Sequence, residues 1–295
     1  MLKINHLSKT YPNGVRALRD VSLEIPTGMF GLLGPNGAGK STLMRTIATL
    51  QEADEGTVTF GDIDVLKQKD ELRKILGYLP QEFGVYAKIS AEMMLDHFAL
   101  LKGIVHSQKR REIVDRLLKM TNLHEVRRRN LGTFSGGMKQ RFGIAQALLG
   151  DPQLIIVDEP TAGLDPEERN RFLNLLGEIG ENVVVILSTH IVADVAELCS
   201  RMAIISEGQL RLTGDPRTVM DSLQGKIWCK AIDKGELNVH RRDFTVISSR
   251  WFGGRLIIHV LSDTPLDRGF APVEADLEDV YFATLKQRPA ASAAA

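Results

Sequence analysis

The sequence has few cysteines and no excess of charge of one sign, and each absence narrows the possible classes of protein. Only two cysteines, Cys199 and Cys229, occur in 295 residues, and both stand in apolar surroundings without the spacing that disulfide, zinc or redox chemistry needs. Lysine plus arginine and aspartate plus glutamate number 37 each. This balance gives no support for wrapping nucleic acid or for lying on an anionic membrane.

Long hydrophobic segments are also missing. The longest apolar runs, such as residues 183–187, cover a handful of residues, and residues 1–6 contain no apolar core of signal-peptide length. Because a bilayer-spanning helix needs about 20 apolar residues, we expect no part of the chain to cross a membrane. The sequence predicts a soluble cytoplasmic protein whose membrane role would pass through a partner. The low-complexity tail, residues 289–295, is expected to be disordered.

What the sequence does contain is a series of short apolar runs separated by helical patterns. The runs, which are typical of strands buried on both faces of a sheet, are 29–33, 154–157, 183–187 and 202–205. The helical patterns lie at 40–50, 138–149 and 167–176. This order predicts an α/β fold with a mainly parallel core sheet. An alternating pattern up to about residue 25, and again at 57–60, adds a small N-terminal antiparallel sheet.

Two changes of pattern predict further units. Residues 82–150 have amphipathic helical spacing and are expected to form a helical subdomain, inserted into a sheet domain that extends over residues 1–222. Residues 223–288 combine strand-like runs with a helix at 274–285 and are expected to form a small accessory α+β domain. The basic cluster at 127–129 is interpreted as a solvated face.

The strongest motif lies between the first core strand and the first helix. Residues 34–41, Gly-Pro-Asn-Gly-Ala-Gly-Lys-Ser, fit the phosphate-loop pattern G-x-x-x-x-G-K-[ST]. Backbone N–H groups of such a loop and the positive end of the following helix bind phosphate oxygens. Lys40 would reach the β- and γ-phosphates, and Ser41 would ligate Mg²⁺. The predicted ATP-binding residues here are Gly34, Pro35, Asn36, Gly37, Ala38, Gly39, Lys40, Ser41 and Thr42.

Two adjacent acids follow the predicted strand at 154–157. Asp158 is expected to hold Mg²⁺ through a water molecule, and Glu159 to act as the general base that activates the attacking water. Adjacent acids after a strand also occur at ordinary loop starts, so the pair acquires its meaning only together with the phosphate loop. The sequence therefore predicts an ATP-hydrolysing site that uses Mg²⁺.

The residues just before this acidic strand resemble a known family. The segment 134–141, Phe-Ser-Gly-Gly-Met-Lys-Gln-Arg, resembles the signature motif of the ABC ATPases, and the order of the motifs matches that family over about residues 1–220. The resemblance implies the P-loop NTPase fold of ABC type. It also implies a head-to-tail dimer, in which the signature of one subunit completes the ATP site of the other. The signature residues implied to do so are Ser135, Gly136 and Gly137.

The same resemblance assigns roles to isolated residues. Tyr11 resembles the aromatic residue on which adenine stacks, and Gln81 the glutamine that links the metal and the water to the transporter contact. His190 resembles the switch histidine at the γ-phosphate, and Asp165 the loop acid that communicates across the dimer. Each has a structural alternative when taken alone: a surface aromatic, a polar loop residue, a loop histidine and a helix N-cap before Pro166.

The match to the family has two departures. The common signature reads Leu-Ser-Gly-Gly-Gln, whereas Phe134 and Met138 stand at its ends here. The serine and glycines between them are retained, and a serine hydroxyl with backbone N–H groups at a helix start can bind a γ-phosphate. The variant ending, the Ala-Gly-Leu-Asp-Pro loop and the segment 277–281 resemble the ATPases of bacterial exporter-type ABC systems.

The resemblance implies partners as well. The second subunit is another copy or a homologous ATPase subunit, and the pair is expected to drive an integral membrane permease from the inner face of the cell membrane. The candidate permease contacts are Phe83, Val85 and Tyr86. Two alternatives stay open: a soluble ABC ATPase acting on a non-transport partner such as the ribosome, DNA or iron–sulfur assembly, and an enzyme that phosphorylates a small substrate. The balanced charge does not favour nucleic acid, and the second alternative does not explain the signature.

Overall fold

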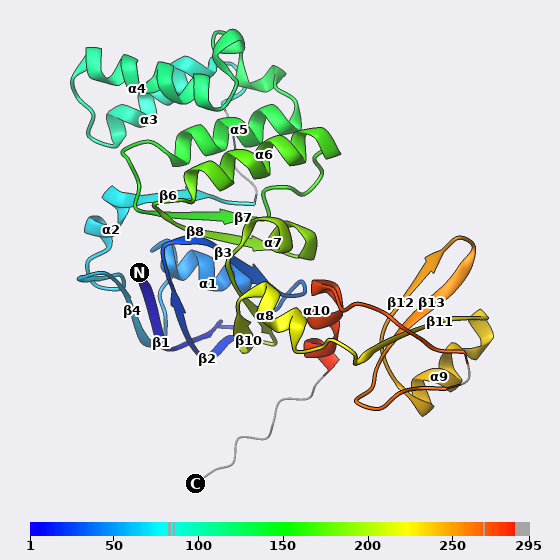
Figure 1. Ribbon diagram of the computed structural model, residues 1–295. Helices are drawn as coiled ribbons and strands as arrows, with labels where there is room; N and C mark the ends of the chain where they lie inside the picture. The colour runs from blue at the N-terminus through cyan, green and yellow to red at the C-terminus, as the bar shows by residue number, and fades with distance from the viewer. Residues whose placement is uncertain (82–83, 85, 268, 287–295) are drawn as a thin grey trace.

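A central sheet of six strands organises the fold. The computed structural model describes residues 1–81, 84, 86–267 and 269–286 (Figure 1). The strands of the core sheet are β3 (Gly28–Leu33), β6 (Leu76–Leu79), β7 (Leu154–Asp158), β8 (Val184–Thr189), β9 (Arg201–Ser206) and β10 (Gln209–Gly214). Their spatial order is β10-β9-β3-β8-β7-β6, and every neighbouring pair is parallel except β9 with β10. The predicted mainly parallel core sheet is confirmed.

The apolar runs of β7 and β8 are continuous because both faces of the sheet are covered. On one face, Ile156 and Ile186 are buried in a core shared with helix α1 (Lys40–Ile47) and the N-terminal strands. On the other face, the alternate residues Ile155 and Val185 are buried against helix α6 (Pro166–Ile179). Successive side chains of a strand point to opposite faces, so a continuous apolar run supplies two cores at once.

A second, antiparallel sheet packs beside α1. Its strands are β1 (Leu2–Thr10), β2 (Arg16–Ile25), β4 (Glu55–Phe60) and β5 (Ile63–Asp64). They pair in the order β2-β1-β4-β5, with every pair antiparallel. The predicted N-terminal antiparallel sheet is therefore confirmed. A short helix that the sequence did not indicate, α2 (Lys69–Ile75), leads from this sheet to β6.

Three helices lie between β6 and β7 and form the upper part of the molecule in Figure 1. They are α3 (Ala91–Leu101), α4 (Ser107–Met120) and α5 (Gly136–Ala147), with the short 3₁₀ turns η1 (His124–Val126) and η2 (Leu131–Thr133). These helices bury an apolar core of their own, which includes Leu95, Leu118 and Phe142. The insertion expected from the amphipathic spacing is therefore present in the fold.

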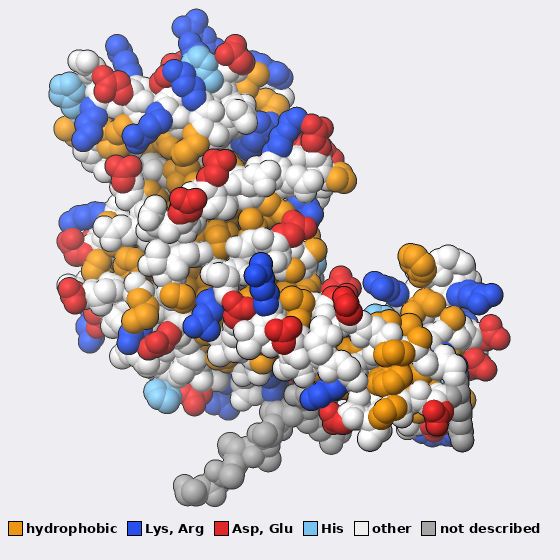
Figure 2. Space-filling model, in the orientation of Figure 1, with side chains coloured by type: hydrophobic (Ala, Val, Ile, Leu, Met, Phe, Trp, Pro, Cys, Tyr) orange, Lys and Arg blue, Asp and Glu red, His pale blue; other side chains and the backbone are white. Residues whose placement is uncertain are grey.

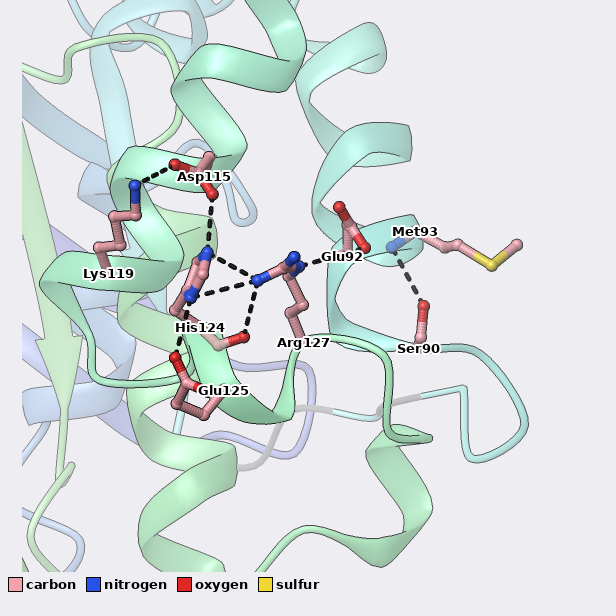
Figure 3. Close-up of polar contacts among 8 residues, drawn as sticks. All are labelled: Ser90, Glu92, Met93, Asp115, Lys119, His124, Glu125 and Arg127. Carbon is pink, nitrogen blue, oxygen red and sulfur yellow. Dashed lines mark hydrogen bonds and ion pairs between the residues drawn. The ribbon is translucent and has the colours of Figure 1, made fainter.

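A polar network joins α3, α4 and η1 (Figure 3). The ring of His124 lies 3.0 Å from Asp115 Oδ1 on α4, and Nη1 of Arg127 lies 2.6 Å from Nε2 of the same ring. Nε of Arg127 is also 3.8 Å from Glu92 Oε2 on α3. The interpretation of residues 127–129 as a solvated face was wrong for Arg127, whose side chain is only 29% exposed, because its guanidinium lies between His124 of η1 and Glu92 of α3.

Two shorter helices complete this part of the chain: α7 (Val192–Leu198) and α8 (Pro216–Asp221). Helix α7 follows β8 directly and packs against β3 and α6. Within the described ranges, no helix has both the length and the hydropathy that crossing a bilayer requires. The predicted tail, residues 289–295, and the candidate permease contacts Phe83 and Val85 lie outside the described residues.

The C-terminal segment forms a third sheet with two helices and a short turn. Its elements are β11 (Ile227–Ile232), η3 (Lys234–Glu236), α9 (Leu237–Asp243), β12 (Thr245–Phe252), β13 (Arg255–Leu261), β14 (Ala271–Pro272) and α10 (Leu277–Lys286). The antiparallel strand order is β12-β13-β11-β14. Figure 2 shows hydrophobic side chains gathered on the visible face of this segment. Trp251 and Phe252, at the end of β12, are 63% and 74% exposed.

Helix α10 joins the C-terminal sheet to the core domain. Its Leu277, Val280 and Tyr281 are buried in the same apolar cluster as α6 and α7, whereas Ala283 packs with Ile227 of the C-terminal sheet. The division at residues 222 and 223 stays a prediction. The last helix, which the sequence assigned to the accessory side of that division, shares its packing with both sides, because its apolar residues occupy more than one face.

Candidate functional site

The predicted motif residues meet at one edge of the core sheet. The phosphate loop follows β3, the acids Asp158 and Glu159 follow β7, and His190 follows β8. Parallel register aligns Leu33 with Thr189, and Asp158 with Ser188. The carboxyl ends of these strands therefore coincide, which is where open α/β sheets place their ligand sites. Strand β8 lies between β3 and β7, so His190, which follows β8, lies between the phosphate loop and the two acids.

The phosphate loop leads into an open helix start. Gly39 caps α1 with φ 106°, and no side chain accepts a hydrogen bond from the first N–H groups of the helix. A Cβ at this position would lie 2.4 Å from the carbonyl oxygen of Ala17, and at Gly34 it would lie 2.3 Å from that of Ile205. Only glycine fits both places. The free N–H groups and the helix dipole together favour an anionic ligand.

Neighbouring strands hold the loop in place. The N–H of Gly208, in the turn between β9 and β10, donates to the Ala38 carbonyl over 2.9 Å, and Arg19 N on β2 donates to Gly208 O over 2.8 Å. The loop backbone is thereby linked to two different sheets. Such fixed backbone dipoles can bind phosphate without rearranging at the moment of binding.

Lys40 lies inside the loop and is almost fully buried. Its Nζ donates to the carbonyl oxygens of Gly34 at 2.6 Å and Pro35 at 3.3 Å, and it lies 3.6 Å from Glu159 Oε1. Burial lowers the pKa of Lys40, while the negative charges of Glu159 and Asp158 oppose that change. The ammonium group is thus held by weak acceptors that phosphate oxygens can replace, since charge-assisted hydrogen bonds are the stronger ones.

Glu159 has a strained backbone and a crowded carboxylate. Its φ of +48° lies in the left-handed region, which is costly for a residue other than glycine, and its N–H donates to the Ser188 carbonyl over 2.8 Å. Oε2 lies 2.9 Å from Nδ1 of His190 and 3.5 Å from Nε2 of Gln81. The strain turns the side chain toward the other motifs, and Glu159, His190 and Gln81 are brought together as predicted.

Asp158 is buried at the end of β7, with 3% of its surface exposed. Burial raises its pKa, and the hydroxyls of Ser188 and Ser41 oppose the rise. Among the described residues, Oδ1 has no hydrogen-bond partner, which is costly for a buried carboxylate oxygen. Carboxylate and hydroxyl oxygens are the donors that hard divalent cations prefer. The residues at this point that could hold Mg²⁺ are Asp158, Ser41 and Gln81.

A cavity of about 980 Å³ opens above these residues. Its lining combines the phosphate loop with parts of the N-terminal sheet and the sheet edge: Tyr11, Gly14, Val15, Arg16, Ala17, Arg19, Pro35, Asn36, Gly37, Ala38, Gly39, Lys40, Ser41, Thr42, Gln81, Glu159 and Glu207. Sequence reasoning missed Arg16, Arg19 and Glu207. Arg16 and Arg19 lie on β2, whose alternation shows which residues face outward but not what they face. Glu207 lies in the turn between β9 and β10, far in sequence from every motif, so nothing local marks it.

Tyr11 stands on the N-terminal side of the cavity. Its hydroxyl donates to Gln51 Oε1 over 2.8 Å and lies 3.1 Å from the hydroxyl of Thr42. Thr42 belongs to the first turn of α1, next to the phosphate loop. The phenol ring is therefore fixed at the edge of the cavity by its polar end, and its aromatic body is left to contact a ligand.

The signature and Asp165 lie elsewhere. Among the described residues, the cavity lining includes none of Ser135, Gly136, Gly137 and Asp165. Ser135 is exposed and caps α5, accepting a hydrogen bond from Met138 N over 3.2 Å. Asp165 caps α6 in the same way, accepting a hydrogen bond from Glu168 N over 2.9 Å. Asp165 therefore has the helix N-cap role that the sequence offered as the alternative to a role in the dimer. This chain alone does not bring the signature to the phosphate loop.

Comparison with known proteins identifies the family. Residues 18–162 match the family described as ABC transporter. The methionine import ATP-binding protein MetN of Helicobacter hepaticus is 34% identical over 257 residues, which cover 82% of this chain and 72% of MetN. This chain belongs to the ABC transporter ATP-binding proteins. A second relative of this ABC protein is the probable multidrug ABC transporter ATP-binding protein YbhF of Escherichia coli, 34% identical over 77% of this chain. The match spans only 39% of the length of YbhF.

Solved structures of ABC ATPases share the fold. The dimeric ATP-binding cassette MJ0796, in a post-hydrolysis state bound to ADP and Pi, has a TM-score of 0.67 and 28% sequence identity, covering 73% of this chain and 98% of that cassette. The assignment to the ABC ATPases made from the signature motif is therefore confirmed, and so is the predicted P-loop fold. As a member of this family, the chain is an ATP-binding ATPase.

Proposed function

We propose that this ABC ATPase hydrolyses ATP as a head-to-tail dimer and powers a membrane ABC transporter in the direction of export. One observation carries the proposal. The cavity collects the phosphate loop, Glu159 and Gln81, and His190 contacts Glu159, but the signature serine Ser135 does not line it. A site with a base and a phosphate cradle but no signature is half of the site that the family resemblance implies. A second subunit supplies the other half.

Each residue of the site has a separate proposed role in ATP binding or hydrolysis. Tyr11 stacks on the adenine ring, and the backbone N–H groups of residues 36–42 bind the phosphates. Lys40 exchanges its two loop carbonyl oxygens for phosphate oxygens. Glu159 accepts the proton of the attacking water, and His190 and Gln81 orient that water and the γ-phosphate. His190 is held ready for this by its 2.9 Å contact with Glu159.

Mg²⁺ fits the oxygen donors at the sheet edge. The unpartnered Oδ1 of Asp158 supports this assignment, as does the neighbouring Ser41 hydroxyl, which partly offsets the raised pKa of Asp158. When bound, Mg²⁺ supplies positive charge that neutralises the phosphates during transfer. Asp158, Ser41 and Gln81 would hold it, the first through a water molecule.

The dimer is expected to be symmetric. If two identical chains pair about a twofold axis, each contributes a phosphate loop to one site and Ser135, Gly136 and Gly137 to the other. Ser135 is exposed at the start of α5, where N–H groups and the helix dipole favour an anion. Asp165 is exposed at the start of α6 and is proposed to communicate between the two sites. A homologous ATPase subunit could replace the second copy.

The partner proposed for this dimer is an integral membrane permease at the inner face of the cell membrane. Support comes from apolar side chains exposed on or beside α3, where Tyr86, Met93 and Leu101 are 67%, 65% and 70% exposed. ATP favours the closed dimer and product the open one, so a permease attached to both halves is driven between two shapes. Export is favoured by the variant signature ending, whereas the name of MetN describes import.

Copurification tests the transport proposal. The tagged chain is isolated from detergent-solubilised membranes of the native cell, and we expect a multi-span membrane protein at a fixed ratio. The paired variant Tyr86→Glu with Met93→Glu should lose that protein while retaining ATP binding, because both side chains lie outside the nucleotide cavity. Isolation with ribosomes or DNA and without a membrane protein would contradict the proposal.

A further inference from the structure

We propose that Asp194 is a positioning residue that fixes the geometry of the Glu159 and His190 pair. It lies on α7, outside every motif that the sequence analysis identified, and its side chain is 0% exposed. The inference rests on the proposed roles of Glu159 and His190 in hydrolysis. It adds to them a residue that touches neither nucleotide nor water and acts through the segments that carry both groups.

Three segments meet on the carboxylate of Asp194. The hydroxyl of Thr161 donates to Oδ2 over 2.5 Å. Nε of Arg169 donates to Oδ1 over 2.7 Å, and Nη2 of the same guanidinium lies 2.6 Å from that oxygen. Thr161 belongs to the loop after β7, and Arg169 to the first turns of α6. Asp194 itself belongs to the helix after β8.

Each segment carries a predicted functional residue close to its contact. Thr161 comes two residues after Glu159, and Asp194, on the first turn of α7, comes four residues after His190. Arg169 N donates to the carbonyl of Asp165 over 2.9 Å. The general base, the switch histidine and the acid at the dimer face are therefore supported by one buried group, although 35 residues separate Glu159 from Asp194.

A buried carboxylate contributes little net free energy to the stability of a fold. Replacing a buried ion pair by apolar residues of similar volume is often neutral or stabilising, because desolvation offsets the attraction of the charges. What such a group provides is direction, since its hydrogen bonds admit few arrangements of the attached segments. The position of Asp194 is thus better explained by the geometry it imposes than by net stability.

That geometry is needed because Glu159 is strained. A φ of +48° persists only when the surrounding structure holds the chain in place. The Thr161 hydroxyl anchors the segment directly after Glu159, and α7 anchors the segment directly after His190. If these anchors are lost, the carboxylate and the imidazole are free to separate. Misplacing a reacting group by 1 Å can lower the rate by about 100-fold.

The test compares variants that remove one hydrogen bond at a time. Thr161→Val removes the hydroxyl with little change in shape, Thr161→Ser retains it, and Asp194→Asn removes the charge. We expect Thr161→Val and Asp194→Asn to lower kcat by about 10-fold or more, with KM for ATP within about 2-fold, and Thr161→Ser to stay near wild type. The valine variant decides the question if Asp194→Asn does not fold.

Asp279→Asn is the matched control for losing a buried acid. Asp279 is 2% exposed, and its Oδ1 lies 2.7 Å from Nδ1 of His259 in the C-terminal segment. It should lower the melting temperature as much as Asp194→Asn does while leaving kcat near wild type. If Asp194→Asn and Thr161→Val also retain kcat, or if Asp279→Asn lowers it equally, the positioning role is overturned.

A double-mutant cycle separates positioning from general damage. Combining Asp194→Asn with His190→Ala should lower kcat by clearly less than the product of the single effects, because both act on the same pair of groups. Multiplicative effects would overturn the inference. The failure of the proposed function is distinguishable: Glu159→Gln would then retain hydrolysis, whereas failure of this inference alone leaves Glu159→Gln inactive and Asp194→Asn active.

Discussion

Glu159 Oε2 lies 2.9 Å from Nδ1 of His190, across the ends of two neighbouring parallel strands. The contact joins the proposed general base directly to the proposed sensor of the γ-phosphate, through side chains of this chain alone. It also explains why the strained backbone of Glu159 is retained, since the turn is what aims the carboxylate at the imidazole.

Replacing Glu159 with Gln should leave ATP binding intact and slow hydrolysis by about 100-fold to 10,000-fold, the usual contribution of a general base. The amide keeps the shape of the side chain but cannot accept the proton. The measurements are phosphate release, ATP titration and light scattering, in which a stable ATP-bound dimer should appear. Turnover at the wild-type rate would remove Glu159 as the base.

Replacing Lys40 with Ala should weaken ATP binding by about 10-fold or more, because charge-assisted hydrogen bonds to phosphate are among the stronger ones. Calorimetric titration measures the affinity. Lys102→Ala is the matched control, because burial lowers the pKa of Lys102 as it does that of Lys40. It likewise donates to two carbonyl oxygens, of Arg73 and Leu76, but lies outside the nucleotide cavity. Equal affinities for the two variants would contradict the role of Lys40.

Replacing Ser135 with Arg should abolish hydrolysis without preventing one subunit from binding ATP, because Ser135 does not line the cavity of its own chain. Mixing this variant with Lys40→Ala should restore activity above that of either alone, since the mixed dimer contains one site with an intact loop and an intact signature. Phosphate release from the mixture is the measurement. An active Ser135→Arg variant would show that the signature does not complete the site.

Replacing Asp158 with Asn should raise the melting temperature of the nucleotide-free protein at neutral pH. Burial raises the pKa of Asp158 above its ordinary value of 3.8, so between 3.8 and that raised pKa the folded state binds more protons than the unfolded state. The ionised group therefore weakens the fold above its folded-state pKa, and this penalty is lost as the pH falls toward 3.8. The difference in melting temperature should shrink on acidification. A difference that is independent of pH would contradict this account.

Replacing Tyr11 with Ala should weaken ATP binding by about 10-fold, within the 1–3 kcal/mol that stacking of one base on an aromatic ring contributes. Tyr11→Phe should retain most of the affinity, because it keeps the ring and loses only the hydrogen bonds to Gln51 and Thr42. GTP and ATP titrations measure the effect on two bases. If both variants lose the same affinity, the hydroxyl rather than the ring makes the contact.

Sequence reasoning found the four inner strands of the core sheet because each is a continuous apolar run, and it missed the two edge strands for a physical reason. β6 has only four residues and includes Gly77, and it lies at the edge of the sheet. β10 is partly buried along most of its length and forms the other edge. An edge strand pairs with only one other strand and lies at the margin of the sheet. Its sequence therefore carries less of the continuous apolar signal that marks a central strand.

The sequence by itself determined the parts of this protein whose chemistry is local. The phosphate loop needs glycine where the backbone turns tightly, and the acids and the signature are contiguous residues, so their spacing is visible without a fold. Only the tertiary structure decided which of them meet. β8 lies between β3 and β7, so His190 contacts Glu159, and the pairing of strands more than 100 residues apart cannot be read from any window of sequence. The Asp194 contacts arise the same way, because a buried carboxylate gains its partners only when separate segments pack around it.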